Sequence, residues 1–164
     1  MELYLIRHGI AQESEAGIRD EERTLTKEGR QKTEKVAKEL KKLNLSFDLI
    51  ASSPLVRAYQ TAEILLETGL SFHLEECHHL APNGDIYSWL AQWLAPRKYS
   101  LQTRLALVGH EPNLSTWAEL LVWGQAHAGI VLKKAGMIGI KLPENESPLG
   151  LSQMFWLTSP KYLL

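Results

Sequence analysis

The residues with the clearest chemical potential are Arg7-His8-Gly9, which follow the apolar run Leu3–Ile6 near the start of the chain. In an open α/β sheet, ligands bind at the carboxyl ends of the strands. A histidine there can act as a nucleophile, an arginine binds phosphate oxygens, and a glycine lets the backbone turn or approach a ligand closely. The triplet therefore predicts one part of a phosphate site, whose other parts must come from elsewhere in the sequence.

Two further expected strands also end in polar residues. The run Phe47–Ala51 leads into Ser52-Ser53-Pro54, with Arg57 in the first turn of the next expected helix. The run Arg104–Val108 leads into Gly109-His110-Glu111, where another helix is expected to start. In a parallel sheet these strand ends lie on the same edge. Two arginines, two histidines and two helix N-termini would then face one point, which suits a phosphate or sulfate dianion.

Each of these features also has a structural interpretation. A strand-end arginine is usually a solvated charge, a single histidine is more often a hydrogen-bonded structural residue, and Ser-Ser-Pro is first of all a strand-to-helix turn. The coincidence of all three at corresponding strand ends is what favours a shared site.

The remaining pattern predicts alternating strands and helices. Strands are expected at 2–6, 47–51, 104–108, 137–142 and 153–157, and a short one at 72–74; helices are expected after Thr26, from Pro54 to about Glu67, and at 85–94 and 113–123. This alternation predicts an α/β protein, a three-layer α/β/α sandwich with a mostly parallel sheet. We see no repeat, low-complexity tract or long linker, so we expect a single domain over residues 1–164.

Composition narrows the classes of function. The chain has 164 residues, a formal net charge of −1, 45% apolar residues and 23% charged residues. Such a charge balance does not favour nucleic acid or an anionic membrane as a partner. No apolar run approaches the roughly 20 residues of a membrane helix, and the first residues lack the pattern of a secretory signal. Cys77 is the single cysteine, which excludes an internal disulfide and is compatible with the cytoplasm, where we expect the protein.

The three motifs together resemble the signature of the histidine phosphatase superfamily, which includes phosphoglycerate mutases and acid phosphatases. The resemblance runs from residue 4 to the end and includes Gln60-Thr61 after Arg57. The short chain is similar to the SixA-type protein phosphohistidine phosphatases, the minimal members. Three stretches fit that branch: Arg23-Thr24-Leu25-Thr26 with Gly29, the turn Pro82-Asn83-Gly84-Asp85, and Leu157-Thr158-Ser159-Pro160.

The resemblance implies a phosphoglycerate mutase-like fold and assigns roles to the strand-end residues. His8 would attack phosphorus and become transiently phosphorylated. Arg7, Arg57 and a protonated His110 would hold the phosphoryl oxygens. The further substrate-binding residues expected are Arg23, Ser52 and Glu111. No cofactor and no metal are implied.

A general acid is missing from its usual place. Many relatives carry a glutamate near the middle of the chain, but Leu80–Asp85 has none, and Asp85 suits a helix cap better. An alkoxide leaving group, with a conjugate-acid pKa of roughly 15.7, needs a proton donor. An imidazole leaving group, with a pKa of about 6.5, scarcely needs one. The absence therefore favours phosphohistidine over a phosphate monoester, in a site left open by short connections.

The expected function is thus a metal-independent protein phosphohistidine phosphatase that acts on histidine-containing phosphotransfer domains of phosphorelays. One alternative is a small-molecule phosphomonoesterase, with Asp85 or another carboxylate as the acid. Another is a phosphoprotein-binding module without turnover, although binding alone does not require His8. The cluster Glu76-Cys77-His78-His79 does not match the spacing of a zinc site, so we expect no metal there.

Overall fold

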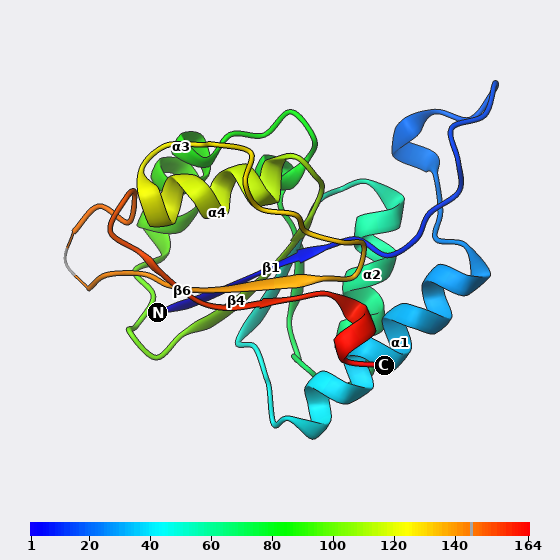
Figure 1. The fold of residues 1–164 in the computed structure, drawn as a ribbon, viewed down its shortest axis with the longest axis horizontal. Coiled ribbons are helices and arrows are strands. Elements are labelled where there is room, and N and C mark those ends of the chain that lie inside the picture. The colour runs from blue at the N-terminus through cyan, green and yellow to red at the C-terminus, as the bar shows by residue number, and fades with distance from the viewer. Residues whose placement is uncertain (145) are drawn as a thin grey trace.

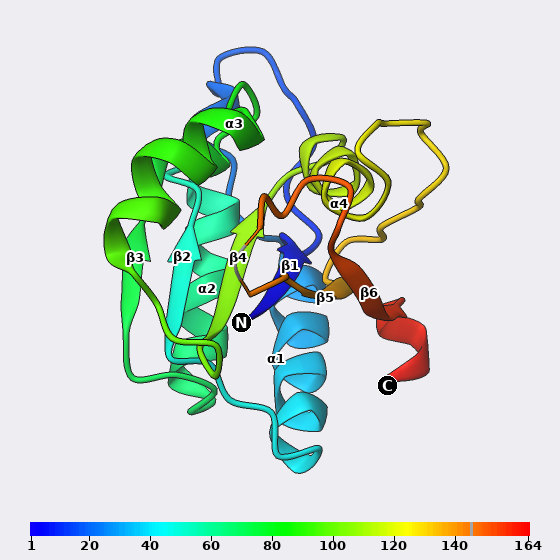
Figure 2. The same ribbon diagram turned by 90° about the vertical axis from the view of Figure 1, so that its left-hand side faces the viewer.

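Six strands form one mixed sheet in the computed structural model, which describes residues 1–144 and 146–164. The strand order is β3-β2-β4-β1-β5-β6, and Figure 2 shows the strands side by side in this order. The strands are β1 (Glu2–Arg7), β2 (Leu49–Ser52), β3 (Leu74–Glu76), β4 (Arg104–Gly109), β5 (Met137–Lys141) and β6 (Gln153–Thr158). Strands β1 to β4 pair in parallel, whereas β5 and β6 pair antiparallel.

Helices cover both faces of the sheet (Figure 1). The helices α1 (Lys27–Lys42) and α2 (Val56–Glu67) lie on one face, and α3 (Ile86–Ser88) and α4 (Asn113–Trp123) lie on the other. The three-layer α/β/α sandwich with a mostly parallel sheet is therefore confirmed. No helix within the described ranges is long and apolar enough to cross a membrane.

The alternation of side chains in the central strands builds two separate cores. Leu3 and Leu5 of β1 face the α4 side, while Tyr4 and Ile6 face α1 and α2. All four are at most 3% exposed. A strand buried on both faces needs apolar residues at every position, which explains the continuous apolar run in the sequence.

Two expected elements differ in detail. The short strand β3 begins at Leu74 rather than Phe72, because Phe72 is 92% exposed in the turn that precedes it. The helix expected at 85–94 does form, but α3 continues as a π-helical turn at Trp89–Leu94. The stacked rings of Trp89 and Trp93, with centroids 5.6 Å apart, pack into the core from this turn.

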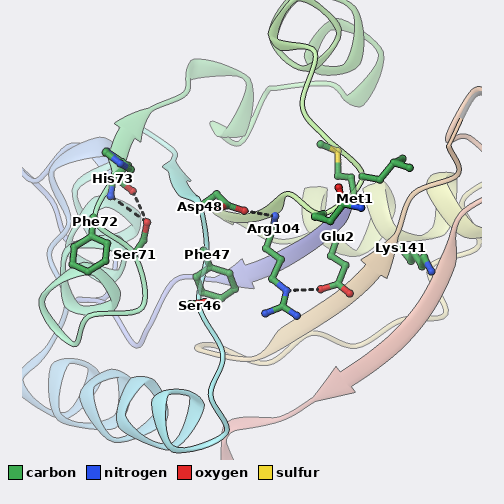
Figure 3. Close-up of a pocket in the computed structure, with 12 residues that line it drawn as sticks. Met1, Glu2, Ser46, Phe47, Asp48, Ser71, Phe72, His73, Arg104 and Lys141 are labelled. Carbon is green, nitrogen blue, oxygen red and sulfur yellow. Dashed lines mark hydrogen bonds and ion pairs between the residues drawn. The ribbon is translucent and has the colours of Figure 1, made fainter.

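The amino ends of the strands are joined by a charged residue. The main-chain N–H of Arg104 donates to Asp48 Oδ2 at 2.8 Å, and its Nε donates to Glu2 Oε2 at 3.1 Å. These contacts border a cavity of ≈ 660 Å³, shown in Figure 3. Through these two contacts Arg104 of β4 links β1, which carries Glu2, to Asp48, the residue before β2.

The start of α1 packs tightly against the segment that follows β1. Thr26 caps the helix by accepting a hydrogen bond from the Gly29 N–H at 2.9 Å, as its sequence position predicted. A Cβ on Gly29 would lie 2.0 Å from the carbonyl oxygen of Ile10. Only glycine lets the helix approach the backbone so closely at this point.

We expect Gly29→Ala to lower the free energy of unfolding by about 1–3 kcal/mol, because overpacking outweighs the gain in helix propensity. Urea denaturation at neutral pH measures the change. Arg30→Ala, at an exposed position one residue later, is the control and should change stability by less than about 0.5 kcal/mol. An increase in the free energy of unfolding of Gly29→Ala would contradict this, since it would mean that the backbone at Ile10 can move away from the added Cβ at no cost.

Candidate active site

The parallel register brings the three predicted strand ends to one level. Arg7 pairs with Gly109, and Ser52 pairs with Val108. The residue after β1 and the residue after β2 continue the pairing with β4. His8 N–H donates to Gly109 O at 3.1 Å, and Ser53 N–H donates to Val108 O at 2.9 Å. His8, Ser53 and His110 therefore start from adjacent points on the carboxyl edge of the sheet.

His8 is held as a neutral imidazole with a defined free nitrogen. Its Nδ1 lies 2.7 Å from the carbonyl oxygen of Gly9, which can only accept a hydrogen bond, so we assign the proton to Nδ1. The side chain is buried, and burial together with the neighbouring His110, Arg57 and Arg7 lowers the pKa of His8 to about 3. The unprotonated Nε2 can therefore serve as a nucleophile.

Arg57 supplies a buried guanidinium next to that nitrogen. The residue is 5% exposed, and its Nε lies 3.4 Å from His8 Nε2. Its other nitrogens bind Asp20: Nη1 donates to the main-chain oxygen at 2.7 Å and Nη2 to Oδ2 at 3.1 Å. The position of Arg57 in the first turn of α2, predicted from the sequence, thus places a cation beside His8.

Asp20 connects Arg57 to Arg23. Its Oδ1 accepts from Arg23 Nη1 at 2.7 Å, and Arg23 Nε also donates to Gln12 O at 2.8 Å. Burial raises the pKa of Asp20, but hydrogen bonds from Arg23 and Arg57 outweigh it and hold the pKa below its usual value. Sequence reasoning placed Arg23 at the site and missed Asp20, whose only signal was its place three residues before Arg23 in an acidic loop.

The Asp20–Glu22 turn lies against the site through the contacts of Asp20 with Arg57. His8, next to Arg57, is 7% exposed. The segment between β1 and α1 that carries this turn extends beyond the carboxyl ends of the strands (Figure 2). The turn itself buries none of its residues, so its displacement would cost little apolar contact.

His110 faces His8 with its ring centroid 5.1 Å away. Its Nε2 lies 2.8 Å from Ser53 Oγ, and its buried Nδ1 has no hydrogen-bond partner among the described residues. Burial, followed by the charge of Arg57, lowers the pKa of His110 to about 4. This lowered pKa favours a neutral ring in the structure described, and the protonated ring expected from the sequence is the form that a neighbouring phosphate dianion would favour.

The two serines of the turn have different contacts. Ser53, which sequence reasoning read as part of a turn, contacts His110 through its hydroxyl. Ser52, the expected substrate-binding residue, is fully buried and its Oγ donates to Ser53 O at 3.0 Å. The hydroxyl that reaches the histidine pair is thus that of Ser53.

Arg7 is anchored by the loop that precedes β5. Its Nη1 donates to Leu132 O at 2.9 Å, and its buried Nε has no partner among the described residues. The N–H of Ala135 donates to the main-chain oxygens of Arg7 and His8 at 3.0 and 3.2 Å. Buried polar groups normally have hydrogen-bond partners. The partnerless Arg7 Nε and His110 Nδ1, in a site rich in arginine, therefore fit an anionic ligand that accepts hydrogen bonds from both.

A buried carboxylate organises this same loop. Glu119 of α4 is 1% exposed and accepts hydrogen bonds from the consecutive main-chain N–H groups of residues 127–130. Burial raises the pKa of Glu119, but these four hydrogen bonds outweigh it and hold the pKa below its usual value. Sequence reasoning missed this residue, although a glutamate inside the apolar run Trp117–Val122 was a signal.

Two other carboxylates act at helix starts. Glu111 accepts from the Ser115 N–H at 2.9 Å and from the Ser115 hydroxyl at 2.7 Å, in the first turn of α4. Asp85 accepts from the Ser88 N–H at 2.9 Å and caps α3, as the sequence predicted. The described residues contain no group of three histidine, cysteine or acidic side chains that could hold a metal ion.

Comparisons with known proteins identify the family and the fold. The family model of the histidine phosphatase superfamily (branch 1) matches residues 3–79. An uncharacterized protein of Picosynechococcus sp. is 42% identical over 165 residues, which cover 100% of this chain and 99% of the relative.

Solved structures share the fold. The protein histidine phosphatase SixA complexed with tungstate is 24% identical, with a TM-score of 0.82 and coverage of 100% of both chains. A proposed alpha-ribazole-5'-P phosphatase of Escherichia coli is 19% identical, with a TM-score of 0.71 and coverage of 98% of both chains. At these identities the similarity shows the phosphoglycerate mutase-like fold and does not distinguish a substrate.

We expect Glu119→Gln to lower the free energy of unfolding by about 2 kcal/mol at pH 7, because an amide oxygen cannot accept all four N–H groups. The pKa of Glu119 is lower in the folded protein than its unfolded value of 4.5. Its ionised carboxylate therefore stabilises the fold fully above pH 4.5, and this stabilisation is lost as pH falls through the folded pKa. The difference from wild type should therefore shrink in acid.

Urea denaturation at pH 7 and in a series below pH 4.5 tests this. Glu63→Gln makes the same change at an exposed position on α2 and should leave stability nearly unaltered. A difference between wild type and Glu119→Gln that stays constant with pH would contradict an ionised Glu119.

Proposed function

Because this chain belongs to the histidine phosphatase superfamily, we propose that it is a cytoplasmic protein phosphohistidine phosphatase that works through a phosphorylated His8. The observation that carries this proposal is the pairing of a neutral, oriented His8 with Arg57 at 3.4 Å. A nucleophile alone or a cation alone would fit many sites, but the two together are what phosphoryl transfer requires.

In the first step, His8 Nε2 donates its lone pair to phosphorus and a new P–N bond forms. The P–N bond of the substrate phosphohistidine, whose other ring nitrogen carries a proton, breaks at the same time, and its electron pair returns to the departing nitrogen, so that a neutral imidazole leaves. The hydrogen bond from Nδ1–H to Gly9 O disperses the positive charge that develops on the His8 ring.

The surrounding donors stabilise the phosphoryl oxygens during this transfer. Arg57 and Arg7 provide fixed positive charge in a buried environment, where charge interactions are stronger than in water. The Nδ1 of His110 is available to donate if the Ser53 hydroxyl donates to Nε2. A bound dianion would also raise the pKa of His110 and favour its protonated form.

The nearby carboxylates support phosphohistidine as the substrate. Asp20 is held ionised by two arginines, Glu111 is hydrogen-bonded to Ser115, and Asp85 caps a helix. A carboxylate with a lowered pKa is a poor proton donor at neutral pH. An imidazole leaving group departs with little help, whereas an alkoxide does not.

In the second step, water attacks phospho-His8. A new P–O bond forms, the P–N bond to Nε2 breaks, and the electron pair returns to the ring. One proton of the water is released to solvent or taken up by the phosphate, and the neutral imidazole is restored. A bound phosphoryl group would compete with Asp20 for Arg57, and displacement of the Asp20–Glu22 turn, which has no buried residues, would admit both the phosphorylated protein and the water.

We propose that residues 1–164 act as one domain and that the partner is a histidine-containing phosphotransfer domain. A small-molecule phosphomonoesterase is the second candidate, because the Escherichia coli structure named above shares the fold. A purified phosphorylated phosphotransfer domain and a panel of sugar phosphates, assayed side by side, separate the two. Turnover of the sugar phosphates alone would reject the phosphohistidine assignment.

We expect His8→Ala to abolish turnover and the acid-labile phosphoenzyme, because His8 Nε2 is the imidazole nitrogen that lies beside Arg57 Nε, at 3.4 Å. Rapid quenching with a radiolabelled phosphohistidine donor measures the phosphoenzyme. His78→Ala removes an exposed histidine outside the site and serves as the matched control. Retained turnover in His8→Ala would rule out the covalent mechanism.

The depressed pKa values lead to a second expectation. In the phosphate-free protein, His8 and His110 should show no titration midpoint between pH 5 and 8, since their pKa values lie at about 3 and about 4. Adding inorganic phosphate should move the midpoint of His110 upward. Imidazole NMR signals, assigned with His8→Ala and His110→Ala, report both, and a phosphate-free midpoint near 6.5 for His8 would contradict the burial argument.

A further inference from the structure

A pocket lined by several lysines, here called the lysine pocket, lies beside the candidate active site. It has a volume of ≈ 400 Å³ and is bordered by the start of α1, the loop before β5 and the turn after β6. Figure 1 shows the C-terminal turn next to α1. The cationic residues that line it are Arg7, Lys32, Lys133, Lys134 and Lys161, and its lining contains no acidic side chain.

The positive charge of this lysine pocket is largely uncompensated. Lys32 pairs with Glu28 at 2.7 Å, and Lys161 lies over the ring of Tyr162. Lys133 and Lys134 make no ion pair with the described residues. The whole chain has a formal net charge of −1, so this concentration of cations is a local feature. An unpaired cluster of this sign attracts anionic groups over a distance of about 10 Å at moderate salt.

The lysine pocket is physically connected to the site. Arg7, which lines the pocket, immediately precedes His8 in the chain. Ala135 follows Lys133 and Lys134 and donates its N–H to the main-chain oxygens of Arg7 and His8. The segment that carries Lys133 and Lys134 is thus bound directly to the main chain of Arg7 and His8.

We propose that the lysine pocket binds acidic side chains that flank the phosphohistidine on the protein substrate, an inference that rests on the proposed function. The site around His8 recognises only the phosphoryl group, which is the same on every phosphohistidine. The lysine pocket would supply the selectivity that the phosphoryl group lacks, mainly by raising the rate of association.

Two phosphohistidine peptides of equal length test this, one with the phosphohistidine flanked by glutamates and one with glutamines in their place. At low salt, wild-type protein should cleave the glutamate peptide with a kcat/KM about tenfold higher. High salt should remove the preference, because exposed charges are screened. N-phosphoimidazole, which carries no flanking side chains, measures the chemistry of His8 alone.

The double variant Lys133→Glu/Lys134→Glu should lose the preference for the glutamate peptide. The matched control Lys35→Glu/Lys38→Glu changes the net charge equally at a different hollow on α1 and should keep the preference. Equal cleavage of both peptides by wild type, or a preference that survives in Lys133→Glu/Lys134→Glu, would overturn the docking inference alone. Failure of wild type to cleave either peptide and N-phosphoimidazole would instead overturn the proposed function and, with it, this inference.

Discussion

The parallel pairing of β4 with both β1 and β2 is the constraint on which the rest of the site depends. It sets Arg7 level with Gly109 and Ser52 level with Val108, so three chain segments leave the sheet at the same height. The two main-chain bonds made by His8 and Ser53 extend that alignment one residue beyond the strands. A shift of one residue in either pairing would turn the alternating side chains to the opposite face and separate the two histidines.

The electrostatics of the site follow from this placement. Burial is the largest cause that lowers the pKa values of His8 and His110, and the charges of Arg57 and Arg7 lower them further. Asp20 balances part of the positive charge without contacting either imidazole through a hydrogen bond. The site thus combines a neutral imidazole with nearby cations: the charges of Arg57 and Arg7 add to burial in disfavouring protonation of His8, and the neutral ring avoids repulsion with them.

Residues next to regular strands could be predicted from the pattern of residues, whereas the loop residue Arg23 was placed at the site only by the family resemblance. Arg7, His8 and His110 follow apolar runs whose periodicity is clear, and Arg57 follows a proline turn, so their meeting could be inferred. Asp20 and Leu132 belong to irregular segments, where no periodicity indicates which way a side chain or carbonyl points. The choice between Ser52 and Ser53 required the register of β2, and the π-helical turn of Trp89–Leu94 required the packing of the tryptophans.

The carboxylate of Glu119 has a consequence for how this protein can diverge. It binds residues 127–130 only through main-chain N–H groups, which every residue except proline provides. Apart from proline, and from β-branched residues at Ala128 with its positive φ, side chains in that loop can therefore be exchanged while the backbone path toward Leu132, and with it the anchor of Arg7, is preserved. The backbone at the carboxyl edge of the sheet is in this way independent of most side chains of the 127–130 loop, so this part of the surface can change in sequence while the position of Arg7 stays the same.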